Sequence, residues 1–409
     1  MTEHYFDQSA TTKPSEAAVR AMNDAAWGNP SSVHRIGTEA AAQLKAARIK
    51  VGATLGLPRV TRDRLIFTSC GTESNNIALL GTAFAKKRDP EKPGVLILSE
   101  GEHPSLENPA RLLEKQGFRV LRVPTAGGVL DLGYLENALA ETGAGGWPVI
   151  FAGFMLVNNE TGAVYDVKSA ASLVRRRFPD AVIHCDAVQG YLKLKKTRFS
   201  PLSLGVDTMT LSAHKVHAVR GAGALYLSEN VIRRKNLVPV MPGGGQEGGF
   251  RSGTENLPAI ASFAAAAEEG FLQLDSRLER TASLRKLLDE GIERLAKTFP
   301  GLGLNTPAGD ALPNIASVRL PGIRSETMLN FLSGRGICVS AGSACSAAAK
   351  KKSAALLAFG LTENEADSVL RVSMDHTNTE DDLSALLSAL EAGLAGLQRK
   401  KQGKFGIQN

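Results

Sequence analysis

Residues 181–215, AVIHCDAVQGYLKLKKTRFSPLSLGVDTMTLSAHK, contain the pattern that decides the fold of this chain. An apolar run stands near each end of the segment, AVIHCD and DTMTLS, and polar residues follow each run directly. The run AVIHCD does not alternate between apolar and polar residues, which is typical of a strand that is buried on both faces of a sheet, and we interpret DTMTLS as a second strand of the same sheet. The segment therefore predicts two buried strands, each of which leads polar side chains into the loop after it.

Four further runs of the same kind stand on either side of this segment: RLIFTS, VLILS, VIFAGFMLV and GALYL. Helix-like stretches such as ESNNIALLGTAFAKK and VKSAASLVRRRF separate several of them. Strands that are interleaved with helices predict an α/β fold, in which a mostly parallel sheet is covered by helices on both faces.

The pattern changes after Pro258. Residues 259–298 carry apolar side chains at helical spacing and predict one long helix, which a strand-like NIASVRL, a Gly/Ser/Ala-rich segment and a helical C-terminus follow. We therefore expect a large domain over residues 16–258. A smaller α+β domain would consist of residues 1–15 and 259–409.

Composition narrows the functional class. The 409 residues include no apolar run as long as a membrane helix, and the N-terminus lacks the apolar centre of a secretory signal. The four cysteines show neither a C-x-x-C pair nor zinc-ligand spacing, so we expect no disulfide framework, no metal site and a reducing cytoplasm.

The formal net charge of +7 comes with short, scattered basic clusters. Only five tyrosines and two tryptophans are present to stack on bases, so we expect an acidic protein partner rather than direct nucleic-acid binding.

Three loops after strands carry the candidate chemistry. Lys215 lies in the loop that follows the strand DTMTLS. A lysine that is partly desolvated at such a position can act as a nucleophilic amine. Asp186 ends the first strand, and its carboxylate would suit a cationic ring nitrogen. The stretch TSCGTESNN, residues 68–76, opens a helix whose free N–H groups suit a phosphate. Taken singly, Lys215 could be an exposed lysine, Asp186 could belong to a structural ion pair, and residues 68–76 could be an ordinary helix cap. Taken together, the amine, the carboxylate and the phosphate-binding N–H groups are the parts of a pyridoxal-phosphate site.

Residues 340–353, SAGSACSAAAKKKS, set Cys345 among small residues and ahead of Lys350–Lys352. Buried cysteines usually have bulkier apolar neighbours. Glycine and alanine would let this backbone move, and nearby positive charge favours a thiolate. Cys345 is thus either a mobile nucleophile, on a loop of about residues 338–353, or a small residue packed in a tight turn.

Nine segments, taken in order, resemble the signature segments of cysteine desulfurases, which are class V members of the aminotransferase fold type I. They are YFDQSATT, GNPSSVHRIG, FTSCGTESNN, EHPSLENP, VNNETGAV, HCDAVQG, LSAHK, GGGQEGGFRSGTEN and VSAGSACSA. The resemblance extends from Tyr5 to about Leu383, and the SAGSAC form is similar to the NifS and IscS group. It implies a pyridoxal-phosphate enzyme that converts L-cysteine to L-alanine. It also implies that a persulfide on Cys345 delivers the sulfur to acceptor proteins for iron–sulfur cluster assembly or tRNA thiolation.

The resemblance assigns roles position by position. Lys215 matches the lysine that is bonded to the cofactor, and Asp186 matches the partner of the pyridine nitrogen. His103 matches the histidine that stacks on the ring and assists proton transfer. Cys345 matches the cysteine that takes the sulfur, and Arg371 matches the arginine that binds the substrate carboxylate. Further cofactor contacts are implied for Gly71, Thr72, Asn159 (which also serves the substrate), Gln189, Ser212 and His214, and for Thr254, which the second subunit of a homodimer would donate.

Some positions depart from the family pattern. Ala218 and Val219 stand where Gly-Pro is usual, Asp375 stands where glycine is common, and a histidine often found after the cysteine is missing. None of these departures removes a catalytic group. The alternatives are another fold type I enzyme, such as a selenocysteine lyase or an aminotransferase, and a non-catalytic scaffold for iron–sulfur assembly.

Overall fold

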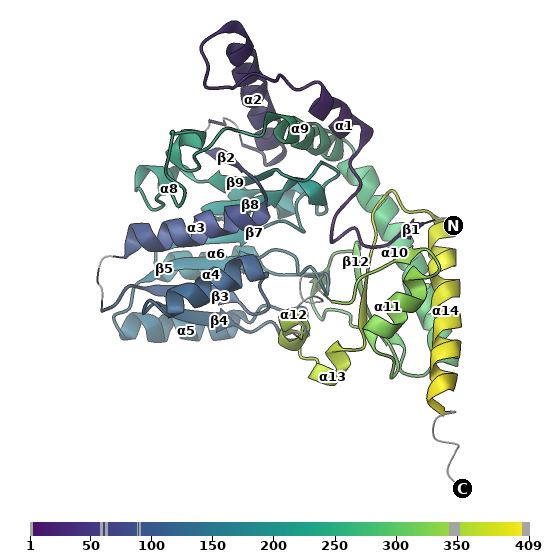
Figure 1. Ribbon diagram of the computed structural model, residues 1–409. Coiled ribbons are helices and arrows are strands. Elements are labelled where there is room, and N and C mark those ends of the chain that lie inside the picture. The colour runs from purple at the N-terminus through teal and green to yellow at the C-terminus, as the bar shows by residue number, and fades with distance from the viewer. Residues whose placement is uncertain are drawn as a thin grey trace.

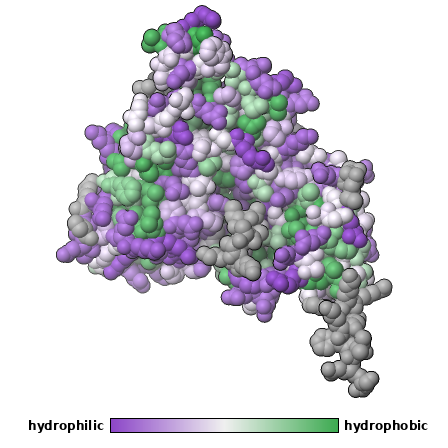
Figure 2. Space-filling view, viewed as in Figure 1, coloured by the Kyte–Doolittle hydropathy of each residue, from purple (hydrophilic) through white to green (hydrophobic). Residues whose placement is uncertain are grey.

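The computed structural model describes residues 3–57, 60–61, 64–87, 89, 91–342 and 352–402, with the backbone alone for 398–402. A large lobe is built around one broad sheet, and a smaller lobe lies beside it (Figure 1). On the face that Figure 2 shows, hydrophilic residues separate smaller apolar groups on both lobes. Within the described ranges, no helix has the length and apolar character needed to cross a membrane.

The sheet of the large lobe has seven strands in the order β2-β9-β8-β7-β5-β3-β4. β9 is antiparallel to both of its neighbours, and every other pairing is parallel. The strands are β2 (Leu65–Thr68), β9 (Gly223–Leu227), β8 (Thr208–Ser212), β7 (Val182–Asp186), β5 (Val149–Met155), β3 (Val95–Ser99) and β4 (Arg119–Val123). The predicted α/β fold and mostly parallel sheet are thus confirmed.

The strand β4 was not among the six apolar runs, because two of the five residues in its sequence RVLRV are charged. It lies at one edge of the sheet. There Arg119 is exposed, and Arg122 pairs with Glu107 at 2.9 Å and with Glu114 at 3.1 Å. Charged residues are usual on edge strands, since they discourage pairing with another chain.

Helices bury both faces of the sheet, as predicted. Neighbouring residues of one strand, such as Ile66 and Phe67, belong to different hydrophobic clusters. α3 (Gly71–Lys86) and α4 (Pro104–Glu114) supply the cluster that contains Ile66, whereas α5 (Leu132–Ala144) and α6 (Val167–Arg177) supply the other. Because successive side chains of a strand point to opposite faces, continuous apolar runs are required here.

The predicted long helix over residues 259–298 is two helices, α9 (Leu257–Leu272) and α10 (Leu274–Thr298), which meet at Gln273. α9 packs with α1 (Glu16–Asn23) and α2 (Arg35–Thr54), and its buried side chains join the core of the large lobe. α10 packs on α14 (Glu380–Gln402) in the smaller lobe. Both helices have an apolar stripe at helical spacing, so the spacing alone did not reveal that they serve two cores.

The smaller lobe contains an antiparallel sheet in the order β10-β12-β14, with α10, α11 (Ser325–Ser333) and α14 packed around it. Its strands are β10 (Gly303–Leu304), β12 (Ile315–Arg319) and β14 (Val369–Ser373). The N-terminal strand β1 (His4–Tyr5) pairs with β13 (Ile337–Cys338), so the start of the chain lies in this lobe (Figure 1).

The remaining described elements are short. They are β6 (Ala163–Val164), β11 (Asp310–Ala311), α7 (Pro201–Leu204), α8 (Glu229–Arg233), α12 (Ala354–Ala358), α13 (Glu363–Ala366) and the 3₁₀ turns η1 (Ala126–Gly128), η2 (Lys196–Arg198), η3 (Ala213–Lys215) and η4 (Glu247–Gly249).

Candidate active site

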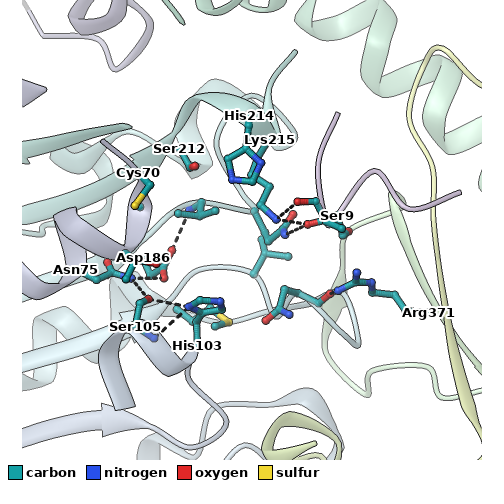
Figure 3. A pocket seen from close by; sticks show the side chains of 18 residues that line it. Ser9, Cys70, Asn75, His103, Ser105, Asp186, Ser212, His214, Lys215 and Arg371 are labelled. Atoms are coloured by element: carbon teal, nitrogen blue, oxygen red, sulfur yellow. Dashed lines mark hydrogen bonds between the residues drawn. The ribbon is translucent and has the colours of Figure 1, made fainter. Parts of the chain in front are cut away.

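A cavity of about 260 Å³ opens where β7 and β8 end (Figure 3). Asp186 is the last residue of β7 and Ser212 the last of β8, and both line the cavity. Ten of the twelve residues predicted for the site line it: Gly71, Thr72, His103, Asn159, Asp186, Gln189, Ser212, His214, Lys215 and Arg371. The roles of these residues remain predictions, but the fold gathers them in one place.

Two predicted site residues are not in this set. Thr254 is exposed, in the segment between η4 and α9, and does not line the cavity. Cys345 lies outside the described residues.

Lys215 ends the 3₁₀ turn η3, which follows β8 directly. Its Nζ donates hydrogen bonds to the carbonyl oxygens of Ser9 and Ala10, the latter at 2.8 Å (Figure 3). Two carbonyl oxygens from the N-terminal segment thus hold the amine at the cavity wall. Ser9 and Ala10 lie within the YFDQSATT segment, but nothing in the sequence identified them as partners of a lysine about two hundred residues away.

Asp186 is held by groups from neighbouring elements. Its Oδ2 accepts from Asn75 Nδ2 at 2.8 Å, and its Oδ1 accepts from the backbone N–H of Val188 at 3.0 Å. The carboxylate is 4% exposed, so these hydrogen bonds replace those that water would offer. The oxygens are therefore fixed toward the cavity, as a partner for a ring N–H requires.

Asn75 is itself fixed by His184, which sequence reasoning did not single out. The Nε2 of His184 lies 3.0 Å from Asn75 Oδ1, and its Nδ1 lies 2.8 Å from Thr208 Oγ1. Burial lowers the pKa of His184 to about 3, so the ring is neutral. Because Asn75 Oδ1 only accepts, the ring proton sits on Nε2, and this arrangement leaves the amide N–H₂ of Asn75 pointing to Asp186.

His103 caps the N-terminus of α4 and faces the cavity (Figure 3). The backbone N–H of Ser105 donates to its Nδ1 at 3.2 Å, so the proton of the neutral ring resides on Nε2. Burial lowers the pKa of His103, and nearby Lys215 lowers it further, while Asp186 opposes the change. His103 is thus neutral near pH 7, with a proton available at Nε2.

The cavity contains an anion cradle at the N-terminus of α3. The N-cap residue, Cys70, makes no side-chain capping bond, and a Cβ at Gly71 would stand 3.0 Å from Val188 Cγ2. Ser212 Oγ is buried and has no hydrogen-bond partner among the described residues. Uncapped helix N–H groups and an unpartnered hydroxyl are the donors that a phosphate requires, so the residues present fit pyridoxal phosphate.

Two side chains beside Lys215 are oriented by polar neighbours. Gln189 donates from Nε2 to the Ser9 carbonyl oxygen at 2.9 Å, and its Oε1 accepts from Lys193 Nζ at 3.0 Å. His214 Nδ1 lies 3.2 Å from Thr11 Oγ1. Burial lowers the pKa of His214 to about 4, with Lys215 contributing, so His214 is neutral at pH 7.

Arg371 comes from β14 of the smaller lobe and reaches the cavity from the opposite side (Figure 3). It is 2% exposed. Its Nη2 donates to Asp7 Oδ1 at 2.8 Å and its Nη1 to the Asn159 carbonyl oxygen at 3.0 Å. A buried guanidinium that two acceptors hold in one orientation is suited to clamp a carboxylate.

Glu102, next to His103, is a further buried acid that sequence reasoning missed. Its Oε1 accepts from the backbone N–H of Met155 at 2.5 Å and from Ser99 Oγ. Burial raises the pKa of Glu102 to about 8, although the hydrogen bond from Ser99 opposes the change. Glu102 is therefore largely protonated at neutral pH.

The sequence and the fold match known proteins over nearly the whole chain. The family model for aminotransferase class-V matches residues 4–386. Cysteine desulfurase IscS 1 from Archaeoglobus fulgidus is 34% identical over 390 residues, which is 94% of this chain and 95% of that protein.

Two solved structures show the same architecture. A NifS-like protein aligns with a TM-score of 0.84 and 32% identity over 96% of this chain and 100% of that chain. SspA in complex with cysteine aligns with a TM-score of 0.75 and 29% identity, over 92% of this chain and 100% of that chain. With the family model matching residues 4–386 and a cavity that fits its cofactor, this chain belongs to the class-V aminotransferase family.

Proposed function

We propose that this protein is a cysteine desulfurase, which removes sulfur from L-cysteine and leaves L-alanine. The observation that carries the proposal is one cavity that contains an amine, a fixed carboxylate, an anion cradle and a carboxylate clamp: Lys215, Asp186, the start of α3, and Arg371. The kinship with IscS 1 of Archaeoglobus fulgidus and with SspA in complex with cysteine supports the same activity and substrate. The family depends on pyridoxal phosphate.

The bound cofactor supplies an electron sink for the carbon atoms of the substrate. Lys215 would hold it covalently through Nζ, Asp186 would face its ring nitrogen, and the first turn of α3 with Ser212 would bind its phosphate. Gln189 and Asn159 would bind the ring oxygen.

On the substrate side, Arg371 would orient the carboxylate through its guanidinium N–H groups. His103 carries a proton at Nε2 that it can donate to a leaving group near the ring, because its Nδ1 accepts a hydrogen bond from Ser105.

We assign the nucleophilic step to Cys345. Its thiolate forms an S–S bond to the sulfur of the substrate as the C–S bond breaks, and the electron pair of that bond stays on the substrate carbon, which takes a proton to become alanine. The persulfide left on Cys345 then passes sulfur to an acceptor.

The residues that flank this segment support its closeness to the cavity. Ser353 Oγ donates to Glu160 Oε2 at 2.6 Å, and a Cβ on Gly342 would stand 3.2 Å from the same oxygen. Glu160 is the neighbour of Asn159, which lines the cavity. Both ends of the segment therefore converge beside the site. Lys352, the last lysine of the basic run, pairs with Asp367 at 2.6 Å, so it is not a free charge beside Cys345.

The wider setting belongs to the same proposal. Acceptor proteins for iron–sulfur cluster assembly or tRNA thiolation would take the sulfur in the cytoplasm. Residues 16–258 together with α9 would form the cofactor domain, and residues 1–15 with the chain from α10 onward the smaller one, since the buried side chains of α9 join the core of the large lobe. A homodimer would let Thr254 reach the phosphate of the second subunit, since it is exposed and lies away from the cavity of its own chain. No observation favours a selenocysteine lyase, an aminotransferase or a silent scaffold over this activity.

The test replaces Cys345 with serine. Incubated with L-cysteine and a reductant, the Cys345→Ser variant should keep the visible absorbance of the bound cofactor and release no sulfide, because a hydroxyl cannot form a persulfide. The matched control, Cys338→Ser, removes a thiol in β13 that does not line the cavity, and it should release sulfide and alanine as the wild type does. Undiminished sulfide release by Cys345→Ser would overturn the assignment.

A further inference from the structure

A second, smaller cavity of about 30 Å³ lies behind the active site, and Lys215 lines both cavities. His217, two residues beyond Lys215, lines it from the large lobe. Asp375 and His376, which follow β14, line it from the smaller lobe, as does Asn314, which precedes β12. The proposed function uses none of these four side chains.

Three of them bring metal-ligand atoms together. One ring nitrogen each from His217 and His376 and one carboxylate oxygen of Asp375 all lie within 4.8 Å of one another. His217 Nε2 and Asp375 Oδ2 are 3.0 Å apart, and no other described residue donates a hydrogen bond to Asp375 Oδ2. Two ligands of a tetrahedral Zn²⁺, with bonds of about 2.0 Å, stand about 3.3 Å apart. The two atoms are therefore close to the spacing of two ligands that share an ion.

In His217 and Asp375, the polar atom that points away from the cavity makes a hydrogen bond, as is usual for the side chains that bind a metal. His217 Nδ1 donates to the Lys13 carbonyl oxygen at 3.0 Å, which leaves the lone pair of Nε2 for the cavity. Asp375 Oδ1 accepts from the backbone N–H and the hydroxyl of Thr377 at 2.9 and 2.6 Å, which leaves Oδ2 for the cavity. Such contacts fix the orientation of metal ligands.

Asn314 supplies a separate observation. It is 7% exposed, its Nδ2 donates to the Met374 carbonyl oxygen at 3.1 Å, and its Oδ1 has no partner among the described residues. Among the described residues, Asn314 Oδ1 thus lacks a donor, and Asp375 Oδ2 has only the ring nitrogen of His217 beside it.

Two cations also line the cavity, but each has a partner other than Asp375. Lys193 Nζ donates to Gln189 Oε1 at 3.0 Å, and Arg277 Nη2 lies 3.5 Å from Glu269 Oε2. In neither contact does the cation donate a hydrogen bond to the buried oxygens of Asp375 and Asn314.

We propose that His217, Asp375 and His376 form a binding site for a divalent transition metal ion of the Zn²⁺ type, with Asn314 Oδ1 as a fourth ligand. Two imidazoles and a carboxylate are ligands that Zn²⁺ accepts, and four protein ligands make a closed, structural site. The ion joins the segment that carries Lys215 to the end of the strand that carries Arg371. It thereby fixes the two halves of the active site relative to each other.

The test measures metal binding, so it is independent of the proposed activity. The full chain, with its cofactor, is used in a Cys345→Ser background so that this thiol cannot bind the probe. After treatment with a chelator, the protein is dialysed against ZnCl₂, and bound zinc is measured by mass spectrometry. We expect about one equivalent per chain, and binding at least about tenfold weaker after His376→Asn, since loss of even an outer partner of a zinc ligand costs that much.

The matched control is His4→Asn, which removes a histidine paired with Asp382 at 2.6 Å outside the cavity and should bind zinc as its parent does. Because His376 is only half-buried, its variant should fold, and circular dichroism checks this; Asp375→Asn is the second variant and should lose binding too.

Two further readouts follow from occupancy. Co²⁺ in place of Zn²⁺ should give visible absorption bands that His376→Asn lacks, and Zn²⁺ should raise the melting temperature of the parent and of His4→Asn but not of His376→Asn. Equal zinc content in the parent and in His376→Asn, or no zinc binding by the parent, would overturn the proposal and leave His217 and Asp375 as a pair of side chains in contact without a metal ion.

Discussion

At the scale of single residues, two buried carboxyl groups beside the cavity have opposite environments. Asp186 accepts hydrogen bonds on both oxygens, from Asn75 and from the Val188 backbone. Glu102 accepts on Oε1 alone, and its Oε2 is buried without a partner among the described residues. One acid thus lines the cavity with both oxygens held, whereas the other lies next to His103, where burial raises its pKa to about 8.

The raised pKa of Glu102 predicts a pH-dependent contribution to stability. Between its ordinary value of 4.5 and the folded value of about 8, the folded state binds more protons than the unfolded state. The stabilisation is therefore complete below about pH 4.5 and is lost as the pH rises toward 8, with a slope of at most about 1.4 kcal/mol per pH unit. Urea unfolding of Glu102→Gln between pH 5 and 8 should lack this slope.

The control for this prediction is Glu290→Gln, an exposed glutamate on α10, which should keep the slope of the wild type. If Glu102→Gln and the wild type lost stability in parallel over this pH range, Glu102 would not be the group that titrates.

At the scale of elements, a buried ion pair holds the turn η4 onto the sheet. Arg48 of α2 donates to Glu247 from Nη1 and Nη2 at 2.6 and 2.8 Å, and the backbone N–H of Phe67 donates to the same carboxylate at 2.7 Å. Glu247 has a φ of +48°, a conformation that costs energy in any residue with a Cβ. The loop that continues to Thr254 therefore begins from a point fixed by α2 and β2.

Replacing Arg48 with methionine should lower the free energy of unfolding by about 3–5 kcal/mol, because it leaves the Glu247 carboxylate buried and unpaired. The matched control lies two residues away on the same helix: Lys50→Met removes an ion pair with Glu268 in which both side chains are nearly half exposed. That change should cost at most about 1 kcal/mol. Similar losses for both variants, measured by urea unfolding, would show that the buried pair adds nothing beyond a surface contact.

At the scale of the whole molecule, the active site depends on both lobes, because Lys215 comes from one and Arg371 from the other. The large lobe also presents apolar side chains to solvent between α1 and α2, where Trp27 is 84% and Val33 98% exposed. Exposed large apolar residues within one short segment of the chain are typical of an interface. They support a second copy of the chain as the partner that receives Thr254.

The proposed homodimer predicts the mass of the protein in solution. Light scattering after size exclusion should give twice the mass of one chain, and the double change Trp27→Glu with Val33→Glu should shift it toward the monomer, because two charges would be buried at the contact. Leu112→Glu, at a 51% exposed position on α4, is the control and should leave the dimer intact. A monomeric wild type would refute the dimer.

Much of the fold could be predicted because its signals are local. A buried parallel strand is a short apolar run in any context, and six of the seven sheet strands were identified in this way. The edge strand β4 was missed because its charged residues are compatible with a strand only at the edge of a sheet. The break at Gln273 was missed because the two helices pack on different cores, which depends on neighbours distant in sequence.

The sequence by itself determined the sheet, the family and the ten residues that line one cavity, since residue type and order along the chain carry that information. Only the tertiary structure decided which groups hold those residues. Asn75 contacts Asp186 across 111 positions and Asp7 contacts Arg371 across 364, and His217 meets Asp375 between the lobes. Such pairs form where separate elements pack, and no local pattern in the chain encodes their partners.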